Sequence, residues 1–171
     1  MGENLKFQKG NKKDADRIYE LFSMGIMEMT ANGIHQWDEK YPNRNDIYED
    51  LEKEELFVGM SGNEIAVAYV LNKECDEQYL NGKWHLETED YIVIHRLCVH
   101  PNFQRKGIGT RTLQHIEETV KQQGIRSIRL DAFSQNPYAL KMYEALGYTV
   151  AGEVNFRKGK FFLMEKVLVS F

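Results

Sequence analysis

The stretch Leu97-Cys98-Val99-His100-Pro101, continued by Asn102-Phe103-Gln104-Arg105-Lys106-Gly107-Ile108-Gly109-Thr110, decides the fold of this 171-residue chain. The first part ends a strand expected over residues 91–99. The second part leads into a helix whose apolar residues Leu113, Ile116 and Val120 recur at helical spacing. Two glycines allow the backbone to turn tightly just before that helix. The pattern therefore predicts a strand, a glycine-rich loop and a helix, with a further half-buried strand over 127–132.

The glycine loop has the properties of a phosphate-binding site. The first N–H groups of a helix have no acceptor within the helix, and the helix dipole favours an anion beside them. From Gln104 to Arg129 the chain carries six basic and two acidic residues, which gives +4 in a chain whose net charge is -4. A glycine-rich turn with no ligand is the alternative interpretation, and the basic surroundings favour phosphate.

Two other nucleotide-binding loops fit these residues less well. No Gly-Lys-Ser/Thr follows the loop at the required spacing, which excludes a Walker loop. A dinucleotide-binding protein stays open as an alternative, because Asp131 ends the next strand 24 residues after Gly107. It is disfavoured because Thr112 stands where the third glycine of that fingerprint would be, and because the loop after Val99 is longer than the fingerprint allows.

The whole pattern predicts one α/β domain (α+β in some schemes) over residues 1–171, with a mixed central sheet flanked by helices and a central strand-helix-strand crossover. Asp14 is expected to cap the first helix, and Asn32-Gly33 to end it. The expected strands are 4–8, 56–60, 64–71, 91–99, 127–132, 148–154 and 160–168, and the expected helices are 14–31, 46–53, 108–124 and 136–147.

Composition excludes several classes of protein. The formal charge of -4 and a pI of about 5.8 disfavour nucleic acid and anionic membranes as partners. No apolar run approaches the roughly 20 residues that span a bilayer, so we expect a soluble cytoplasmic protein. The two cysteines, Cys75 and Cys98, lack the paired spacing of a metal site and are expected to be free thiols. We therefore expect no metal.

The residues resemble the GCN5-related N-acetyltransferase (GNAT) superfamily. Its central motif, Gln/Arg-x-x-Gly-x-Gly/Ala after a strand reading Leu-x-Val-x-Pro, is similar to residues 97–109 of this chain. A second family motif, Asn-x-x-Ala-x-x-x-Tyr-x-x-x-Gly-Phe, is matched by Asn136, Ala139, Tyr143 and Gly147, with Tyr148 in place of the final Phe. The resemblance is strong over 91–168 and rests on element order before that.

The resemblance implies acetyl-CoA as the acyl donor. Its pantetheine arm would pair with the backbone of the strand at 97–99, as an added peptide strand does, and its pyrophosphate would lie on the amides of residues 105–110. Asn136, Ala139 and Tyr143 would face the thioester, and Tyr143 would protonate the leaving thiolate. The alternative for Tyr143 is an aromatic that only packs against the sheet. The acetyl-CoA-binding residues so implied are Leu97, Cys98, Val99, Gln104, Arg105, Lys106, Gly107, Ile108, Gly109, Thr110, Asn136, Ala139 and Tyr143.

Acetyl transfer to an amine also needs a base and a donor to the carbonyl oxygen. Backbone amides near Val99 are expected to supply the donor. Many family members carry Glu on this strand at the position of Val93, so the usual base is missing. His95 lies two residues further on the same strand face, and its ordinary pKa near 6.5 suits a base at neutral pH. A structural histidine with a water relay is the alternative.

Cys98 has no histidine partner in the sequence pattern, and we interpret it as a small strand residue.

The acceptor is expected to be a primary amine: a small amine, a peptide N-terminus or a lysine. Asp38–Glu55 carries eight acidic and three basic residues, and Glu74–Asp90 carries six and one, so each segment has a charge of -5. This charge is either a solvated surface or a field that attracts a cationic amine. Trp37 and Tyr41 either line the amine site or cap the core.

The sequence therefore predicts an acetyl-CoA-dependent N-acetyltransferase that works by direct transfer in a ternary complex. An acyl-CoA-binding module without catalytic activity is the alternative, since Val93 replaces the usual base, and dinucleotide binding ranks third. A homodimer remains open, because one sequence does not determine oligomeric state.

Overall fold

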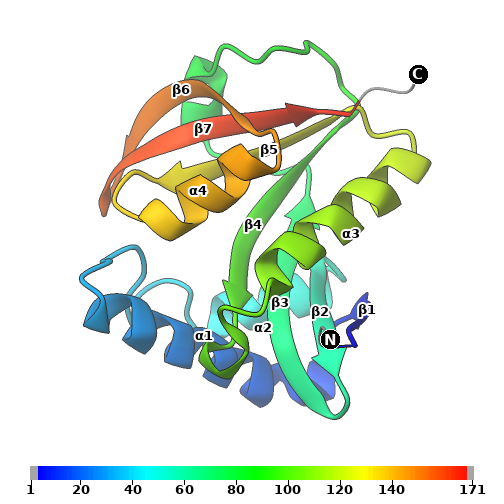
Figure 1. The fold of residues 1–171 in the computed structure, drawn as a ribbon, viewed down its shortest axis with the longest axis vertical. Coiled ribbons are helices and arrows are strands. Elements are labelled where there is room, and N and C mark those ends of the chain that lie inside the picture. The colour runs from blue at the N-terminus through cyan, green and yellow to red at the C-terminus, as the bar shows by residue number, and fades with distance from the viewer. Residues whose placement is uncertain (1–3, 169–171) are drawn as a thin grey trace. The chain divides into compact units, whose positions relative to one another are not determined.

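The computed structural model describes residues 4–168 and contains a mixed seven-stranded sheet in the order β1-β2-β3-β4-β5-β7-β6 (Figure 1). β4 and β5 are parallel and are connected through helix α3, which confirms the expected crossover, whereas the pairs β1–β2, β2–β3, β5–β7 and β6–β7 are antiparallel. The α/β class and the order of the expected helices and strands are thereby confirmed. The strands are β1 Lys6–Lys9, β2 Leu56–Ser61, β3 Glu64–Asn72, β4 Tyr91–Val99, β5 Ser127–Phe133, β6 Thr149–Phe156 and β7 Gly159–Val167.

Four α-helices and three short 3-10 helices complete the described part of the chain. The α-helices are α1 Ala15–Ala31, α2 Arg44–Glu52, α3 Ile108–Gln122 and α4 Pro137–Ala145, and the 3-10 helices are η1 Lys12–Asp14, η2 Glu77–Asn81 and η3 Pro101–Phe103. Within 4–168, no helix combines the length and the apolar character that crossing a membrane requires.

The contacts divide the chain into two compact units. Among the described residues, unit 1 comprises 4–71 and 96–112, and unit 2 comprises 72–95 and 113–168. The boundary falls inside β4, between His95 and Arg96, and inside α3, between Thr112 and Leu113. The single domain expected over 1–171 stays a prediction, and residues 1–3 and 169–171 lie outside the described part.

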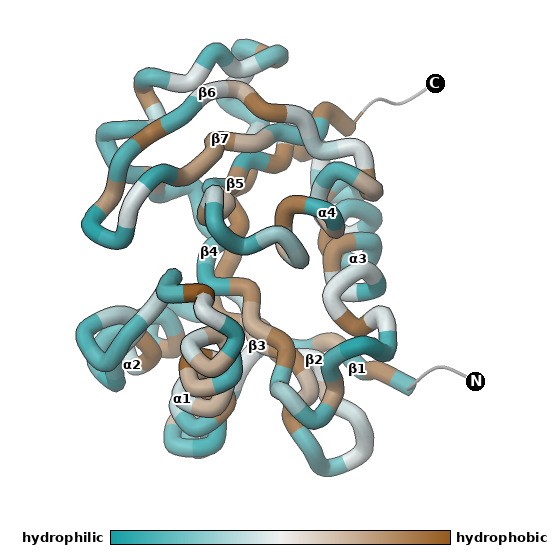
Figure 2. Tube along the Cα trace, turned by 60° about the vertical axis from the view of Figure 1, so that its left-hand side comes forward, coloured by the Kyte–Doolittle hydropathy of each residue, from teal (hydrophilic) through white to brown (hydrophobic). Residues whose placement is uncertain are grey.

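Unit 1 is a small antiparallel sheet covered by two helices. Apolar residues of α1 and α2 pack with residues of β2 and β3 in one buried cluster, whose fully buried members include Ile18, Phe22, Ile47 and Ala68. The hydrophobic residues of β3 are visible as brown segments in Figure 2. Nearly all of β3 is buried, because six consecutive residues from Ile65 to Val70 are each at most 6% exposed. This packing holds α1 and α2 against the strands.

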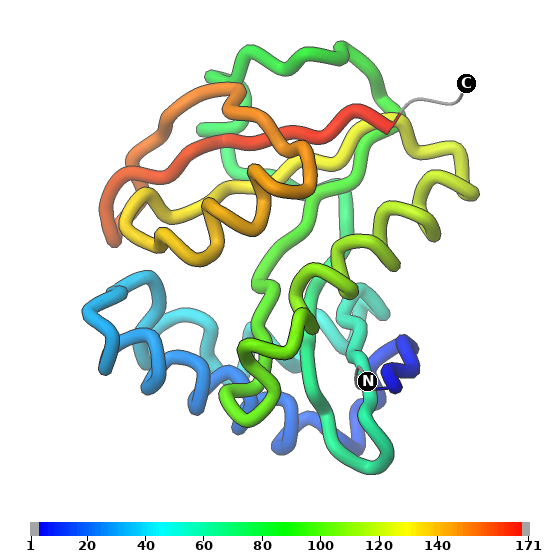
Figure 3. The backbone as a smooth tube through the Cα atoms, viewed as in Figure 1, coloured from blue at the N-terminus to red at the C-terminus, as the bar shows by residue number. Residues whose placement is uncertain are grey.

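Unit 2 contains β5, β6, β7 and the first part of β4, and Figure 3 shows the chain running from β5 through α4 into the β6–β7 hairpin. The connector of residues 72–90 is fastened to these strands by hydrogen bonds. The backbone N–H of His85 donates to Oε1 of the buried Glu165 (2.6 Å), and Arg129 Nη2 donates to the carbonyl of Leu86 (2.9 Å). Lys83 N–H donates to the carbonyl of Ala151 (2.7 Å). The connector, which includes η2, is therefore ordered and bound to the strands of unit 2.

Two helix starts differ from the sequence expectation. Asp14 stands at the N-cap of α1 but makes no capping hydrogen bond there. The chain begins its turn earlier, because the side chain of Asn11 accepts the N–H of Lys13 and starts η1, which runs directly into α1. α2 likewise starts before 46, because Asn43 and Asp46 form a reciprocal capping box.

Candidate functional site

The residues predicted for the site fall into both units. Unit 1 contains Leu97–Val99, the glycine loop of residues 104–110, Trp37 and Tyr41, and unit 2 contains His95, Asn136, Ala139 and Tyr143.

The glycine loop is held in a backbone conformation that glycine favours. Gly107 has φ of +73°, and Arg105 has φ of +64°, so two residues of the loop lie in the left-handed region. A Cβ at Gly107 would meet no atom within 4 Å, so the requirement for glycine at this position is conformational rather than steric. The N–H of Arg111 donates to the carbonyl of Gly107 (3.0 Å) and makes the first turn of α3. The N–H groups of Ile108, Gly109 and Thr110 therefore stand at the open end of the helix.

The surroundings of this loop fit a polyanionic phosphate. Arg105 and Lys106 are exposed, and the fully buried Ile108 anchors the start of α3. Gln104 reaches back to β4, where its Nε2 donates to the carbonyl of Val99 (3.4 Å). The N–H groups of the first helical turn, two exposed cations and the helix dipole all favour a bound anion. The donor set is therefore chemically suited to the pyrophosphate of a CoA thioester.

Thr112 explains why the loop departs from a dinucleotide fingerprint. Its side chain is completely buried, and its hydroxyl donates to the carbonyl of Ile108 one turn earlier (2.7 Å). A residue with this role fills space at the helix surface, where the fingerprint needs a glycine for close packing. The structure thus agrees with the low rank given to dinucleotide binding.

The strand that precedes the loop points its side chains to two environments. Leu97 and Val99 pack against the buried cluster of Ala66, Val67, Phe103 and Ile108. Cys98 faces α1, where a Cβ on Gly25 would lie only 2.5 Å from its Sγ. Burial raises the pKa of the Cys98 thiol to about 12, so this cysteine is protonated at neutral pH. Its geometry agrees with a packing role and gives no support to a covalent acetyl-enzyme.

Asn136 and Ala139 are linked by a helix cap. Oδ1 of Asn136 accepts the backbone N–H of Ala139 (3.2 Å), and Pro137 occupies the first turn of α4. The motif spacing of these two residues therefore has a structural cause. Tyr143, one turn further along, is 8% exposed, and its ring lies edge-on to Tyr148 with centroids 5.7 Å apart. Burial, and secondarily the charge of Asp131, raise the pKa of the Tyr143 phenol far above its ordinary value, so it is a protonated donor at neutral pH.

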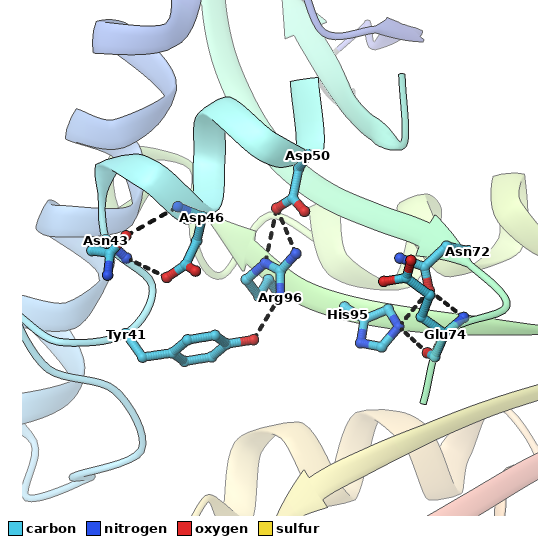
Figure 4. Close-up of polar contacts among 8 residues, drawn as sticks. All are labelled: Tyr41, Asn43, Asp46, Asp50, Asn72, Glu74, His95 and Arg96. Atoms are coloured by element: carbon cyan, nitrogen blue, oxygen red, sulfur yellow. Dashed lines mark hydrogen bonds and ion pairs between the residues drawn. The ribbon is translucent and has the colours of Figure 1, made fainter. Parts of the chain in front are cut away.

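His95 is held by the start of the connector, as Figure 4 shows. Its Nε2 lies 2.8 Å from Oδ1 of Asn72 and 2.9 Å from the backbone carbonyl of Glu74. A carbonyl can only accept, so Nε2 carries the proton in this arrangement. The nitrogen of neutral His95 that can accept a proton is then Nδ1. Val93, at the position where the family often has Glu, is completely buried.

Trp37 and Tyr41 have different surroundings. The Trp37 ring lies edge-on to Phe22, with centroids 5.9 Å apart, and packs against the core of unit 1. Tyr41 is 38% exposed, and its hydroxyl accepts a hydrogen bond from Nη1 of Arg96 (2.6 Å). Of the two alternatives in the sequence, the core contact fits Trp37, whereas Tyr41 presents an exposed ring.

Arg96 and Asp50 form a charged pair that the sequence did not indicate. Both Nε and Nη2 of Arg96 donate to Oδ2 of Asp50, at 3.1 and 2.5 Å, and both side chains are about nine-tenths buried (Figure 4). Arg96 also has φ of +49°, which is uncommon for a residue with a side chain inside a strand. An arginine in the apolar strand 91–99, and an aspartate between Ile47 and Leu51 on the inner face of α2, were the available signals.

Groups of three or more His, Cys, Asp or Glu side chains arranged to hold a metal ion are not found in the part of the chain that the structure describes.

Comparison with known proteins identifies a family and a relative that match most of this chain. The family model described as "Acetyltransferase (GNAT) family" matches residues 18–148. The uncharacterized N-acetyltransferase YesJ of Bacillus subtilis is 28% identical over 145 residues, which are 82% of this chain and 79% of that protein.

Two solved structures share the fold. A GNAT-family acetyltransferase from Streptococcus agalactiae superposes with a TM-score of 0.88 at 24% identity, covering 99% of each chain. The PaiA N-acetyltransferase from Thermoplasma acidophilum, solved in complex with coenzyme A, gives a TM-score of 0.72 at 16% identity, over 96% of this chain and 99% of that one.

Proposed function

The chain belongs to the acetyltransferase (GNAT) family and is an acetyl-CoA-dependent N-acetyltransferase, and we propose that its acceptor is a primary amine which attacks the thioester directly. The observation that carries the acyl-CoA part of this proposal is the glycine loop, with its left-handed Gly107 and the N–H groups of 108–110 in the first turn of α3. The acceptor is a small amine, a peptide N-terminus or a lysine side chain.

We assign the parts of acetyl-CoA to the residues that the family motifs mark. The pyrophosphate binds the N–H groups of the glycine loop, with Arg105 and Lys106 beside it. The pantetheine arm pairs with the backbone of 97–99. The apolar side chains of Leu97 and Val99 are already engaged in the buried cluster of unit 1, so the strand offers its backbone rather than its side chains.

Tyr143 is proposed to be the general acid. When the amine nitrogen bonds to the carbonyl carbon, the C–S bond breaks and its electron pair stays on sulfur. The phenol then gives its proton to this thiolate. The raised pKa of Tyr143 supports the role, because the donor stays protonated at every pH at which the enzyme is expected to work.

His95 is proposed to take a proton from the acceptor ammonium through Nδ1. The hydrogen bond from Nε2–H to the Glu74 carbonyl supports this assignment, because it fixes the tautomer and the orientation of the ring. The same arrangement excludes Nε2 as the base for as long as that hydrogen bond persists.

The acidic segments 38–55 and 74–90 support a cationic acceptor. Each has a charge of -5, and the exposed Tyr41 ring belongs to the first of them. Arg96 holds the Tyr41 hydroxyl, so the ring is fixed in position before an acceptor arrives. We propose that Tyr41 contacts the acceptor and that Trp37 supports its loop from the core.

Thiol release from acetyl-CoA in the presence of a panel of amines tests the proposal. We expect CoA to appear only with acetyl-CoA and amine together, and an acetylated amine to accumulate in equal amount. A protein that binds acetyl-CoA without releasing CoA with any amine would instead be an acyl-CoA-binding module.

A thermal shift tests the ligand and the loop. Acetyl-CoA at about 100 times its Kd stabilises by about 2.7 kcal/mol and should raise Tm by several degrees, whereas NAD should not. Gly109→Asp should remove the shift, because its side chain and charge occupy the phosphate position. Gly62→Asp, which adds the same charge in the open turn between β2 and β3, should keep it. Stabilisation by NAD alone would overturn the assignment.

A further inference from the structure

Two titratable residues of unit 2 follow the paired stretch of β4 and β5. The parallel pairing runs from Tyr91–Ser127 to Val93–Arg129, and His95 and Asp131 each come two residues beyond its last pair on their strands. Because side chains alternate along a strand, His95 and Asp131 share the sheet face of Val93 and Arg129. The Arg129 guanidinium lies 4.3 Å from the centroid of the Tyr91 ring, which confirms that this face is common to both strands.

The connector of residues 72–90 supplies a hydrogen-bond partner to both residues. Asn72 and Glu74 hold His95 through Nε2, and the hydroxyl of Tyr79 in η2 donates to Oδ2 of Asp131 (2.6 Å). Both side chains are only partly buried, so neither is sealed into the core. The fold thus holds an imidazole and a carboxyl group on one sheet face, each oriented by a hydrogen bond with the connector.

The neighbours of Asp131 make its carboxyl a weak acid. The pKa of Asp131 is raised to about 6, chiefly by burial; the hydrogen bond from Tyr79 opposes this rise, and the nearby charge of Asp76, before η2, adds to it. From α4, the phenol of Tyr143 is close enough that ionised Asp131 raises its pKa. The residue opposite on β7 is the apolar Leu163. The carboxylate is therefore present at neutral pH and is ready to accept a proton as the solution approaches pH 6.

We propose that Asp131 is a further catalytic residue, which accepts the second proton that the acceptor nitrogen loses and returns it to Tyr143. The inference rests on the proposed acetyl transfer and deepens it. An acceptor that arrives as an ammonium loses two protons on its way to an amide, and His95 accounts for only the first.

The proton balance of the reaction then closes. His95 takes one proton from the ammonium and releases it to water. The amine bonds to the carbonyl carbon, the C–S bond breaks, and Tyr143 gives its proton to sulfur. The nitrogen, now carrying a positive charge, gives its second proton to Asp131, and the Asp131 carboxyl passes that proton to the Tyr143 phenolate. The products are amide, thiol and one solvent proton, and both residues are back in their starting states.

The order of acid strengths agrees with this direction of transfer. A carboxyl group with a pKa of about 6 is a far stronger acid than the Tyr143 phenol, so the last step runs downhill. The nitrogen that has just attacked a carbonyl is much more acidic than a free ammonium, so a carboxylate is basic enough to deprotonate it.

Asp131→Asn tests the proposal, because it keeps an acceptor for the Tyr79 hydroxyl and removes the proton-accepting group. We expect kcat to fall by roughly 10²-fold with the Kd for acetyl-CoA unchanged, and the acid limb of the kcat profile near pH 6 to disappear. A kcat within about threefold of the wild type, or an acid limb that persists unchanged, would overturn the proposal.

Two neighbours of Asp131 provide matched variants that move the limb without removing the carboxyl group. Tyr79→Phe deletes the hydrogen bond that lowers the pKa of Asp131 and should shift the limb to higher pH. Asp76→Asn deletes the charge that raises it and should shift the limb to lower pH. A merely structural Asp131 would leave the limb of kcat in place in both variants, and that result would refute the role.

The experiment distinguishes failure of the Asp131 role from failure of the proposed acetyl transfer. If the wild type releases no CoA with any amine in the panel, the acetyl transfer itself is wrong. If the wild type turns over and Asp131→Asn does so equally well, only the role of Asp131 is wrong.

Discussion

Two carboxyl groups, Asp50 in unit 1 and Asp131 in unit 2, have partners of different kinds. Burial raises the pKa of both. Arg96 opposes the effect of burial on the pKa of Asp50, because its Nε and Nη2 both donate to Oδ2 of Asp50. Asp131 instead accepts a hydrogen bond from the neutral phenol of Tyr79, and the like charge of Asp76 raises its pKa further. The Asp50 carboxylate is therefore tied to a counterion, whereas we expect the Asp131 carboxyl, which is bound by a neutral phenol, to keep its capacity for proton transfer.

The largest effect is expected from breaking the charged pair. Arg96→Met leaves Asp50 buried without its counterion, and removing one partner of a buried pair costs roughly 3 kcal/mol or more. We expect urea unfolding to show a loss of about 3 kcal/mol for this variant. Asp50→Asn combined with Arg96→Met should recover part of the loss, because no charge is then left buried. A loss below about 0.5 kcal/mol in the single variant would show that the pair does not hold unit 1 together.

A change of comparable size, in activity rather than stability, is expected at Tyr143. Tyr143→Phe keeps the ring packed against Tyr148 and removes the proton donor, so kcat should fall by roughly 10²-fold while the Kd for acetyl-CoA is unchanged. In the Asp131→Asn background the additional loss should be small, because both residues serve the same proton. A kcat within about threefold of the wild type would make Tyr143 a packing residue.

His95 should have a smaller effect. If Nδ1 takes the first proton, kcat/KM for the amine should rise through an apparent pKa of about 6 to 7, and His95→Gln should lower kcat/KM by about tenfold near pH 7 and remove that limb. The ammonium of the acceptor can produce a similar limb, so two amines of different basicity must be compared. A limb that follows the amine and survives in His95→Gln would show that water, not His95, takes this proton.

The smallest effect concerns the contact between α1 and β4. Gly25→Ala alone brings a Cβ within 2.5 Å of Cys98 Sγ, and we expect thermal unfolding to show a loss of about 1 kcal/mol from overpacking. In the Cys98→Ala background the same substitution should instead stabilise by roughly 0.5–1 kcal/mol, because alanine is the better helix former. If Gly25→Ala changes the stability in the same direction in both backgrounds, the contact with Cys98 is not the reason that glycine stands at position 25.

The sequence predicted the elements whose signals are local. The hairpin around Ser61-Gly62-Asn63, the end of α1 at Asn32-Gly33 and the Asn136-Pro137 start of α4 all lie where short-range turn and cap chemistry places them. Asp14 stands at the N-cap of α1 as predicted, but its side chain makes no capping hydrogen bond, because the turn already starts at η1, where Asn11 is the capping residue.

The candidate site was predictable only as far as its motifs extend. The glycine loop and Tyr143 belong to spaced motifs, whereas Arg96 and Asp131 depend on pairings between residues 46 and 52 positions apart in the chain. No local pattern marks the partner of an isolated charge in a strand. The proton-bearing nitrogen of His95 was also outside the reach of sequence, because it follows from a hydrogen bond to a backbone carbonyl.

The central claim is that the folded protein contains an ionised Asp131 although this ionised carboxylate lowers its stability. The most direct test is the free energy of unfolding of Asp131→Asn and the wild type, measured as a function of pH. A carboxyl group whose pKa is about 6 when folded, against an ordinary value of 3.8, destabilises the protein progressively as pH rises from about 4 to 6. The free energy of unfolding of the wild type should therefore fall relative to that of the variant as pH rises across this interval. Above it, the difference between the two should be constant. A difference between the two proteins that is the same at pH 4 and pH 8 would contradict the account.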